Sequence, residues 1–246
     1  HLLFYHPRAI LQVRIITLHS PMSHTYEVEI KSLLGSKENA DALVANLKKH
    51  DPALSVSAHE KQLNHYFTVP AGVDLGKALS HLIPADKKEI FDLIVKEGKK
   101  LSVRTREANG KVIFIIKASV GDDSSSNGVK RIEFETEVPV TLENLDQALL
   151  SAGLTYQAKW SRERDQYTSG DVNVCIDKNA GYGYLAEFEK MSKDESQLET
   201  TKTELLALMK SLGAAELPQD RLERMFAHYN AHWSEYYGTE KVFNIE

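Results

Sequence analysis

YEVEIK at residues 26–31 is the stretch that decides how this chain folds. In an extended strand successive side chains point to opposite faces, so Glu27, Glu29 and Lys31 share one face and the aliphatic residues between them share the other. Two carboxylates about 7 Å apart on one face repel each other unless a cation lies between them. Taken alone, this alternation is typical of the solvated face of an ordinary antiparallel sheet.

The same alternation returns in five later segments, where the charges are sorted by sign. The segments are SVRTR at 102–106, IIK at 115–117, RIEFETE at 131–137, RER at 162–164 and LAEFE at 185–189. A solvated sheet face normally mixes opposite charges, because like charges side by side destabilise it. The other possibility is that these faces converge inside a barrel. There the acidic residues would bind a divalent metal ion and the basic residues a polyphosphate. Alternation alone does not decide between the two.

The order of these motifs resembles the CYTH superfamily, also called the triphosphate tunnel metalloenzymes. Glu27-x-Glu29-x-Lys31 is followed by Arg-x-Arg, Lys, Glu, Arg-x-Arg, Asp and a final Glu-x-Glu, and the similarity runs over residues 26–190. The resemblance implies an α+β fold built on a mainly antiparallel, eight-stranded closed β-barrel that forms a triphosphate tunnel. Helices would pack outside this barrel, and the C-terminus would be helical.

The resemblance also implies roles for individual side chains. Five carboxylates would hold one or two Mg²⁺ or Mn²⁺ ions, which prefer oxygen ligands: Glu27, Glu29, Asp177, Glu187 and Glu189. Six cations would bind the phosphate oxygens and serve catalysis: Lys31, Arg104, Arg106, Lys117, Arg162 and Arg164. A further catalytic residue would be an acidic side chain lining the tunnel, Glu135, with Glu133 on the same face as its alternative.

Four residues near these motifs differ from the family pattern or have no role in it. Family members commonly have Asp-x-Tyr where this chain has Asn64-His65-Tyr66, so we assign no catalytic role to Asn64. We interpret His65 as a hydrogen-bonded strand residue, because no second histidine at ligand spacing accompanies it. Lys159 lies an odd number of residues from Arg162, so the two side chains have opposite parity, that is, they point to opposite faces of the strand unless a bulge intervenes. Lys178 is expected to point outward.

Local signals place helices between the strand pairs. Caps and breakers predict helices at 36–49, 74–82, 85–96 and 141–151, and further strands at 55–69, 155–167, 171–177 and 184–189. Asn109-Gly110 predicts a hairpin between the Arg104 and Lys117 strands. Helical spacing returns at 194–213 and 218–233, and the apolar residues of this last segment are expected to contact the barrel exterior: Met225, Phe226, Tyr229 and Trp233. The tail 236–246 is a candidate to fold over an opening.

Composition limits the class of protein. With 246 residues and 42% hydrophobic content, the chain can bury one sizeable core. Its net charge of −5 argues against a general nucleic-acid binder. The single cysteine, Cys175, excludes an intramolecular disulfide, is expected to be packed in a strand, and fits a cytoplasmic location. No run approaches the roughly 18 apolar residues that cross a membrane.

We expect three regions. Residues 1–21 are predicted to be a non-native or disordered leader, with Met22 as the start and an added strand as the alternative. Residues 22–190 are predicted to form the tunnel barrel, and residues 191–246 to form helices that pack on it. Within the barrel, 121–128 is an Asp/Ser/Gly-rich loop that is expected to be mobile and lacks a phosphate-binding lysine pattern.

Three functions fit this reading. The first is a metal-dependent triphosphatase acting on tripolyphosphate, thiamine triphosphate or a nucleoside triphosphate. The second is a class IV adenylyl cyclase that makes cyclic AMP from ATP in the same pocket. The third is a polyphosphate-binding module without turnover. The triphosphatase is preferred, because both Glu-x-Glu pairs are present and no residue identifies a base-reading pocket. The protein is expected to act as a monomer or homodimer on a small molecule, without nucleic acid or membrane.

Overall fold

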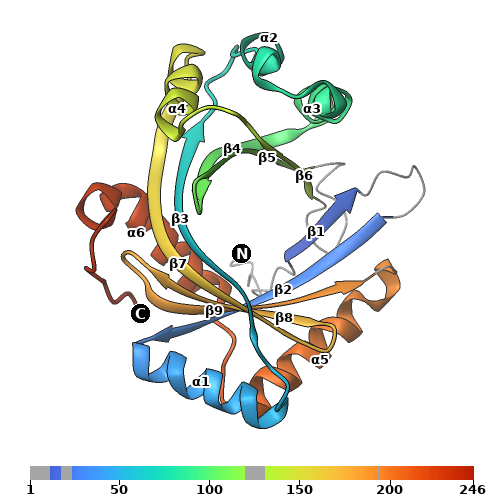
Figure 1. The fold of residues 1–246 in the computed structure, drawn as a ribbon, viewed down its shortest axis with the longest axis vertical. Helices are drawn as coiled ribbons and strands as arrows, with labels where there is room; N and C mark the ends of the chain where they lie inside the picture. The colour runs from blue at the N-terminus through green and yellow to red at the C-terminus, as the bar shows by residue number, and fades with distance from the viewer. Residues whose placement is uncertain (1–11, 18–23, 120–130, 193) are drawn as a thin grey trace, which may run out of the picture.

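The computed structural model describes residues 12–17, 24–119, 131–192 and 194–246, and its strands form one strongly curled sheet (Figure 1). The strands are β1 (Gln12–Thr17), β2 (His24–Gly35), β3 (Val56–Thr68), β4 (Lys99–Ala108), β5 (Lys111–Ser119), β6 (Arg131–Glu137), β7 (Thr155–Ser169), β8 (Val172–Asn179) and β9 (Gly183–Ser192). Eight of them pair antiparallel in the order β2-β9-β8-β7-β3-β4-β5-β6. The predicted eight-stranded antiparallel sheet is therefore confirmed.

Strand β1 lies between the two edge strands of this sheet. It pairs antiparallel with β2 along its whole length and parallel with β6 at two positions, 14 with 131 and 15 with 132. Within the described residues, no pairing joins β2 directly to β6. Residues 12–17 belong to the segment expected to be a leader, whereas 1–11 and 18–21 lie outside the described residues, as does the loop expected at 121–128.

In the part of the chain that the structure describes, six α-helices accompany the sheet. They are α1 (Lys37–His50), α2 (Leu75–Leu79), α3 (Lys88–Glu97), α4 (Leu142–Ser151), α5 (Leu198–Ser211) and α6 (Gln219–Tyr236). The predicted caps are present: the Ser36 and Thr141 side chains accept hydrogen bonds from backbone N–H groups in the first turns of α1 and α4. Among the described helices, none is long and apolar enough to cross a bilayer.

Two apolar clusters attach helices α1 to α5 to the convex side of the sheet (Figure 1). Val28 and Ile30 of β2 pack with Leu43 and Leu47 of α1 in one cluster, to which α5 also contributes. The second cluster joins α2, α3 and α4 to β4, β5 and β6. Because the aliphatic residues of 26–31 face these helices, the charged residues between them face the concave side.

The turn between β4 and β5 follows the predicted chemistry. Asn109 and Gly110 both have positive φ, at 50° and 80°. Such angles suit a two-residue hairpin turn, and asparagine and glycine adopt them at the lowest cost. This hairpin sets the register that places Arg104 opposite Ile115 and Arg106 opposite Ile113.

Helix α6 occupies one end of the curled sheet. Its Met225 and Tyr229 belong to a buried cluster with Trp160 and Leu185, and the Tyr229 and Trp160 rings stack with centroids 3.6 Å apart. Trp160 lies two residues from Arg162, so both are on the concave face. The expectation that Met225 and Tyr229 contact the exterior was wrong, because β7 runs past the end of β8 and leaves apolar concave residues for α6 to cover.

The segments on either side of α6 are attached to the sheet at that same end. The Leu217 backbone N–H donates to the Lys31 carbonyl on β2 at 2.7 Å. After the helix, the Gly238 N–H donates to Ser161 Oγ on β7 at 2.9 Å. The tail then pairs with the turn between β8 and β9, where the Phe243 N–H donates to the Gly181 carbonyl. Helix α6 thus spans from β2 to β7.

Candidate functional site

Backbone pairing gathers the predicted charged residues on the concave face. Lys31 lies opposite Glu187 across β2 and β9, and Arg164 lies opposite Asp177 across β7 and β8. Cross-strand partners share a face, so residues far apart in the sequence become neighbours. The charged segments that are separate in the sequence therefore lie together on the concave face of the sheet.

Three of the five predicted metal ligands form a compact group, here called the acidic triad: Glu27, Glu29 and Glu189. One carboxylate oxygen from each lies within 4.8 Å of those of the other two, and Glu27 is only 5% exposed. Three carboxylates at this spacing suit a hard divalent cation that prefers oxygen ligands. The triad therefore fits Mg²⁺ or Mn²⁺.

Within the triad, Glu29 pairs with Lys31, and the other two predicted ligands also make ion pairs with basic residues. Glu187 contacts Lys31, with Lys31 Nζ 3.2 Å from its Oε1, and its other oxygen accepts a hydrogen bond from Arg164 Nη2. Burial by itself would raise the pKa of Glu187, but Lys31, Arg164 and Arg162 outweigh it and hold this pKa well below the usual range. Glu187 is thus a carboxylate that stays ionised among cations.

Asp177 is fully buried and accepts hydrogen bonds from two arginines. Arg164 donates through Nε and Nη2, both at 2.6 Å, and Arg162 donates through Nη1 at 2.9 Å. Burial opposes the charge of Arg164, yet Glu187 and Asp177 raise its pKa above the ordinary arginine value. The paired geometry makes Asp177 the counter-ion that orients two phosphate-binding candidates.

Arg104 and Arg106 extend from β4, and among the described residues no such buried carboxylate accepts a hydrogen bond from either of them. The Arg104 guanidinium lies 4.3 Å from the centroid of the Tyr66 ring, and Arg106 Nη1 lies 3.9 Å from Glu135 Oε2. Burial, together with nearby Arg162, lowers the pKa of Arg106. Burial would raise the pKa of Tyr66, but Arg104, Arg162 and Arg106 outweigh it and lower this pKa from its ordinary value. Positive charge is concentrated here.

Lys117 and the two acidic residues of β6 complete the concave face. Lys117 Nζ lies 3.0 Å from Glu133 Oε2, whereas Glu135 approaches Arg106. The two glutamates share a face and serve different cations, so neither replaces the other in this arrangement.

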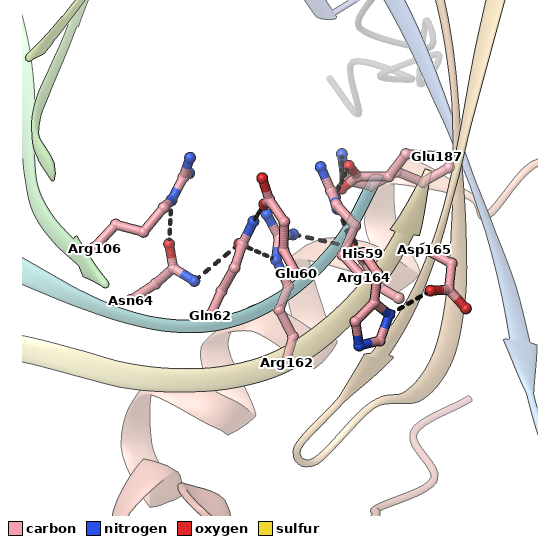
Figure 2. Close-up of polar contacts among 11 residues, drawn as sticks. His59, Glu60, Gln62, Asn64, Arg106, Arg162, Arg164, Asp165 and Glu187 are labelled. Carbon is pink, nitrogen blue, oxygen red and sulfur yellow. Dashed lines mark hydrogen bonds and ion pairs between the residues drawn. The ribbon is translucent and has the colours of Figure 1, made fainter. Parts of the chain in front are cut away.

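Sequence reasoning missed two buried amides on β3, Gln62 and Asn64. They lie between the arginines of β4 and β7: Arg106 Nε donates to Asn64 Oδ1 and Arg162 Nε donates to Gln62 Oε1, each at 2.7 Å. Figure 2 shows Gln62, Asn64 and Arg162 projecting from the same side of β3 and β7, with Arg106 approaching Asn64. Gln62 and Asn64 precede Tyr66 by four and two residues, and residues two apart in a strand share a face. This spacing could have placed both amides on the same face as Tyr66.

Several residues lie away from this face, as their parity indicates. His65 contacts Asp146 of α4 at 2.6 Å and the Tyr237 hydroxyl at 2.8 Å, so it is a satisfied strand histidine. Lys159 pairs with His65 across β7 and β3, and its Nζ lies 4.1 Å from the Tyr156 ring centroid. Lys178 is half-exposed and pairs with Glu240, which confirms its outward direction.

Cys175 lies opposite Glu187 and is buried. Burial raises the pKa of its thiol to about 12, so it stays protonated near neutral pH. This side chain is packed in the strand, as expected.

The sequence profile of the CYTH domain matches residues 25–221, which is well over half of the chain. The chain belongs to the CYTH family. The match in this CYTH chain continues past residue 190, the expected end of the barrel region, to the beginning of α6. Among curated proteins, none matches the sequence.

Solved structures share the fold of this CYTH chain at low sequence identity. A conserved hypothetical protein from Pyrococcus furiosus has a TM-score of 0.55 at 19% identity, over 80% of this chain and 98% of that one. The PH1819 protein from Pyrococcus horikoshii OT3 has a TM-score of 0.56 at 18% identity, over 82% and 99%. A candidate adenylate cyclase from Vibrio parahaemolyticus has a TM-score of 0.53 at 17% identity, over 82% and 97%. At such identities, the likeness concerns the fold alone.

Proposed function

We propose that this CYTH protein is a metal-dependent triphosphatase that removes the terminal phosphate of a triphosphate inside a channel enclosed by the sheet. Strand β1 would complete the enclosure, because it pairs with both edge strands of the eight-stranded sheet. Tripolyphosphate, thiamine triphosphate and nucleoside triphosphates are the candidate substrates. The observation that carries the proposal is that one concave face holds both the acidic triad and three arginines from two strands.

The arginines would bind the phosphates. Arg104 and Arg106 extend from one strand and Arg162 from another, and guanidinium groups bind phosphate oxygens through pairs of parallel hydrogen bonds. Phosphoryl transfer depends mainly on positioning and charge stabilisation. A nucleophilic serine, cysteine or histidine is therefore not required.

The acidic triad would hold Mg²⁺ or Mn²⁺. The bound ion would neutralise charge on the phosphate oxygens and make a coordinated water more acidic. In the reaction, a water oxygen attacks the terminal phosphorus in line with the anhydride oxygen. The P–O anhydride bond breaks, the diphosphate leaves with that oxygen, and a concave-face carboxylate accepts the proton of the water.

The test is a substrate screen with defined products. Tripolyphosphate, thiamine triphosphate, ATP and GTP are each incubated with Mg²⁺, Mn²⁺ or a chelator, and phosphate, ADP and cyclic AMP are separated. We expect metal-dependent release of one phosphate per substrate. Cyclic AMP as the product of ATP would indicate the cyclase instead. Calorimetric binding of tripolyphosphate without phosphate release would indicate a binding module.

A matched pair of arginine variants links the activity to the concave face. Arg104→Ala is expected to weaken both tripolyphosphate binding and turnover. Arg224→Ala serves as the control, because Arg224 lies half-exposed on α6 and pairs with Asp220 one turn away. Equal kinetics for the two variants would remove Arg104 from the site.

A further inference from the structure

The two amides of β3 form a hydrogen-bonded chain that begins at a carboxylate. Gln62 Nε2 donates to Glu60, and Asn64 Nδ2 donates to Gln62 Oε1 at 3.4 Å. The same Gln62 oxygen accepts from Arg162 Nε, and Asn64 Oδ1 accepts from Arg106 Nε. Figure 2 shows the chain running along β3 from Glu60 to Arg106.

The carboxylate at one end sets the orientation of both amides. An ionised carboxylate only accepts hydrogen bonds, so the NH₂ group of Gln62 must turn toward Glu60. The Gln62 oxygen then faces Arg162 and Asn64. Asn64 must in turn present its NH₂ group to that oxygen, which leaves its own oxygen for Arg106. Both amides are at least nine-tenths buried, so water offers little competition for these contacts.

The acceptors that hold these two arginines through Nε carry no net charge. A carboxylate in the same place would orient a guanidinium equally well, as Asp177 does for Arg164, but would also cancel its positive charge. An amide oxygen uses the Nε–H and leaves the charge available. Among the described residues, the carboxylate that approaches Arg106 is that of Glu135, whose Oε2 lies 3.9 Å from Nη1, which is longer than a hydrogen bond.

We propose that Gln62 and Asn64 are positioning residues that hold Arg162 and Arg106 through neutral acceptors at Nε, so that Arg106 keeps its charge for phosphate oxygens and Arg162 shares only its Nη1 with the Asp177 carboxylate. This inference rests on the proposed triphosphate function.

The first test measures side-chain orientation without substrate. In ¹⁵N–¹H spectra, the Nε–H signals of Arg106 and Arg162 are expected to be protected from solvent exchange. Asn64→Ala should remove the protection of Arg106, and Asn64→Asp should preserve it, because an acceptor oxygen remains. Loss of protection on Asn64→Asp, or no change on Asn64→Ala, would overturn the proposed contact.

The second test measures the effect of neutrality on catalysis. Asn64→Asp and Gln62→Glu are expected to raise KM for tripolyphosphate about ten- to a hundredfold, with a smaller change in kcat, since a charged hydrogen bond changes affinity by that order. Asn64→Ala is also expected to raise KM, because it releases Arg106, and in an Arg106→Lys background this rise should disappear, because lysine has no Nε–H donor to hold. A purely structural role would instead leave the effect additive.

Asn46→Ala is the matched control for both tests. Asn46 lies on α1 and donates to the Leu212 carbonyl at 3.0 Å, away from the concave face, so KM and kcat should not change. Wild-type turnover with unchanged KM in Asn64→Asp and Gln62→Glu would overturn the positioning role alone. Wild-type protein that neither binds nor hydrolyses a triphosphate would overturn the proposed function, and this inference with it.

Discussion

Replacing Asp177 with alanine is expected to destabilise the protein even when no metal is added. The Asp177 carboxylate is fully buried and accepts three hydrogen bonds from Arg162 and Arg164, whose side chains are 18% and 14% exposed. Family resemblance implies a metal ligand at this position, whereas the contacts indicate a counter-ion. The two roles differ in what is lost when the carboxylate is removed.

The expected size of the loss follows from these contacts. Removing one partner of a buried ion pair costs about 3–5 kcal/mol, because the other charge remains uncompensated. Arg164 keeps a second partner in Glu187, so we expect a value near the lower end, about 3 kcal/mol. In a chain of this length such a loss lowers Tm by roughly 6–12 °C.

The assay is thermal and urea unfolding in a chelator, repeated with Mg²⁺ or Mn²⁺. Asp177→Asn keeps the acceptor oxygen and should lose less, so it replaces the alanine variant if that fails to fold. Asp171→Ala is the control: Asp171 is 73% exposed and pairs with Lys190, and exposed pairs contribute at most about 1 kcal/mol. If Asp177→Ala matched wild-type stability in chelator but needed more metal for activity, the counter-ion reasoning would be refuted.

Three further predictions concern the triad, the basic cluster and the C-terminal attachment. Glu29→Gln should raise the metal concentration needed for half-maximal phosphate release at least about tenfold, with metal-free tripolyphosphate binding changed less; equal losses in both would contradict this. Ionised Tyr66 adds negative charge beside the arginines, and its pKa lies below the ordinary tyrosine value, so KM should rise in the alkaline range, and Tyr66→Phe should abolish this rise. An alkaline profile that is the same in both proteins counts against that role. Tyr237→Phe removes the hydrogen bond to His65, should cost about 0.5–1.5 kcal/mol, and should speed hydrogen exchange after α6; unchanged exchange would show that this contact does not hold the segment.

Local sequence signals were sufficient for the elements and for the direction of most side chains. The period of two in 26–31 assigned Val28 to the helix-covered side and Glu27 to the other, because successive residues of a strand must point in opposite directions. The Asn109-Gly110 turn, with its positive φ angles, joined β4 to β5 as expected. These features depend on neighbours along the chain, and such neighbours are visible in a linear sequence.

The partners of each charge could not be read in that way. Asp177 and Glu187 have the residue type and parity of metal ligands, yet they contact arginines and a lysine, because the strand order brings β7 and β2 against β8 and β9. Gln62 and Asn64 meet their arginines only because β3 lies between β4 and β7. The position of α6 depends in the same way on how far β7 extends past β8.

Residue type and alternation therefore predict which side chains can share a face, whereas the tertiary structure determines which of them are in contact. Pairing between distant strands is governed by register and strand length across the whole sheet, and a short motif contains no information on either. For this CYTH chain, the sequence is enough to predict a charged concave face. The choice of counter-ions, amide acceptors and end-covering helix belongs to the three-dimensional arrangement, because it depends on distances between residues that are remote in the chain.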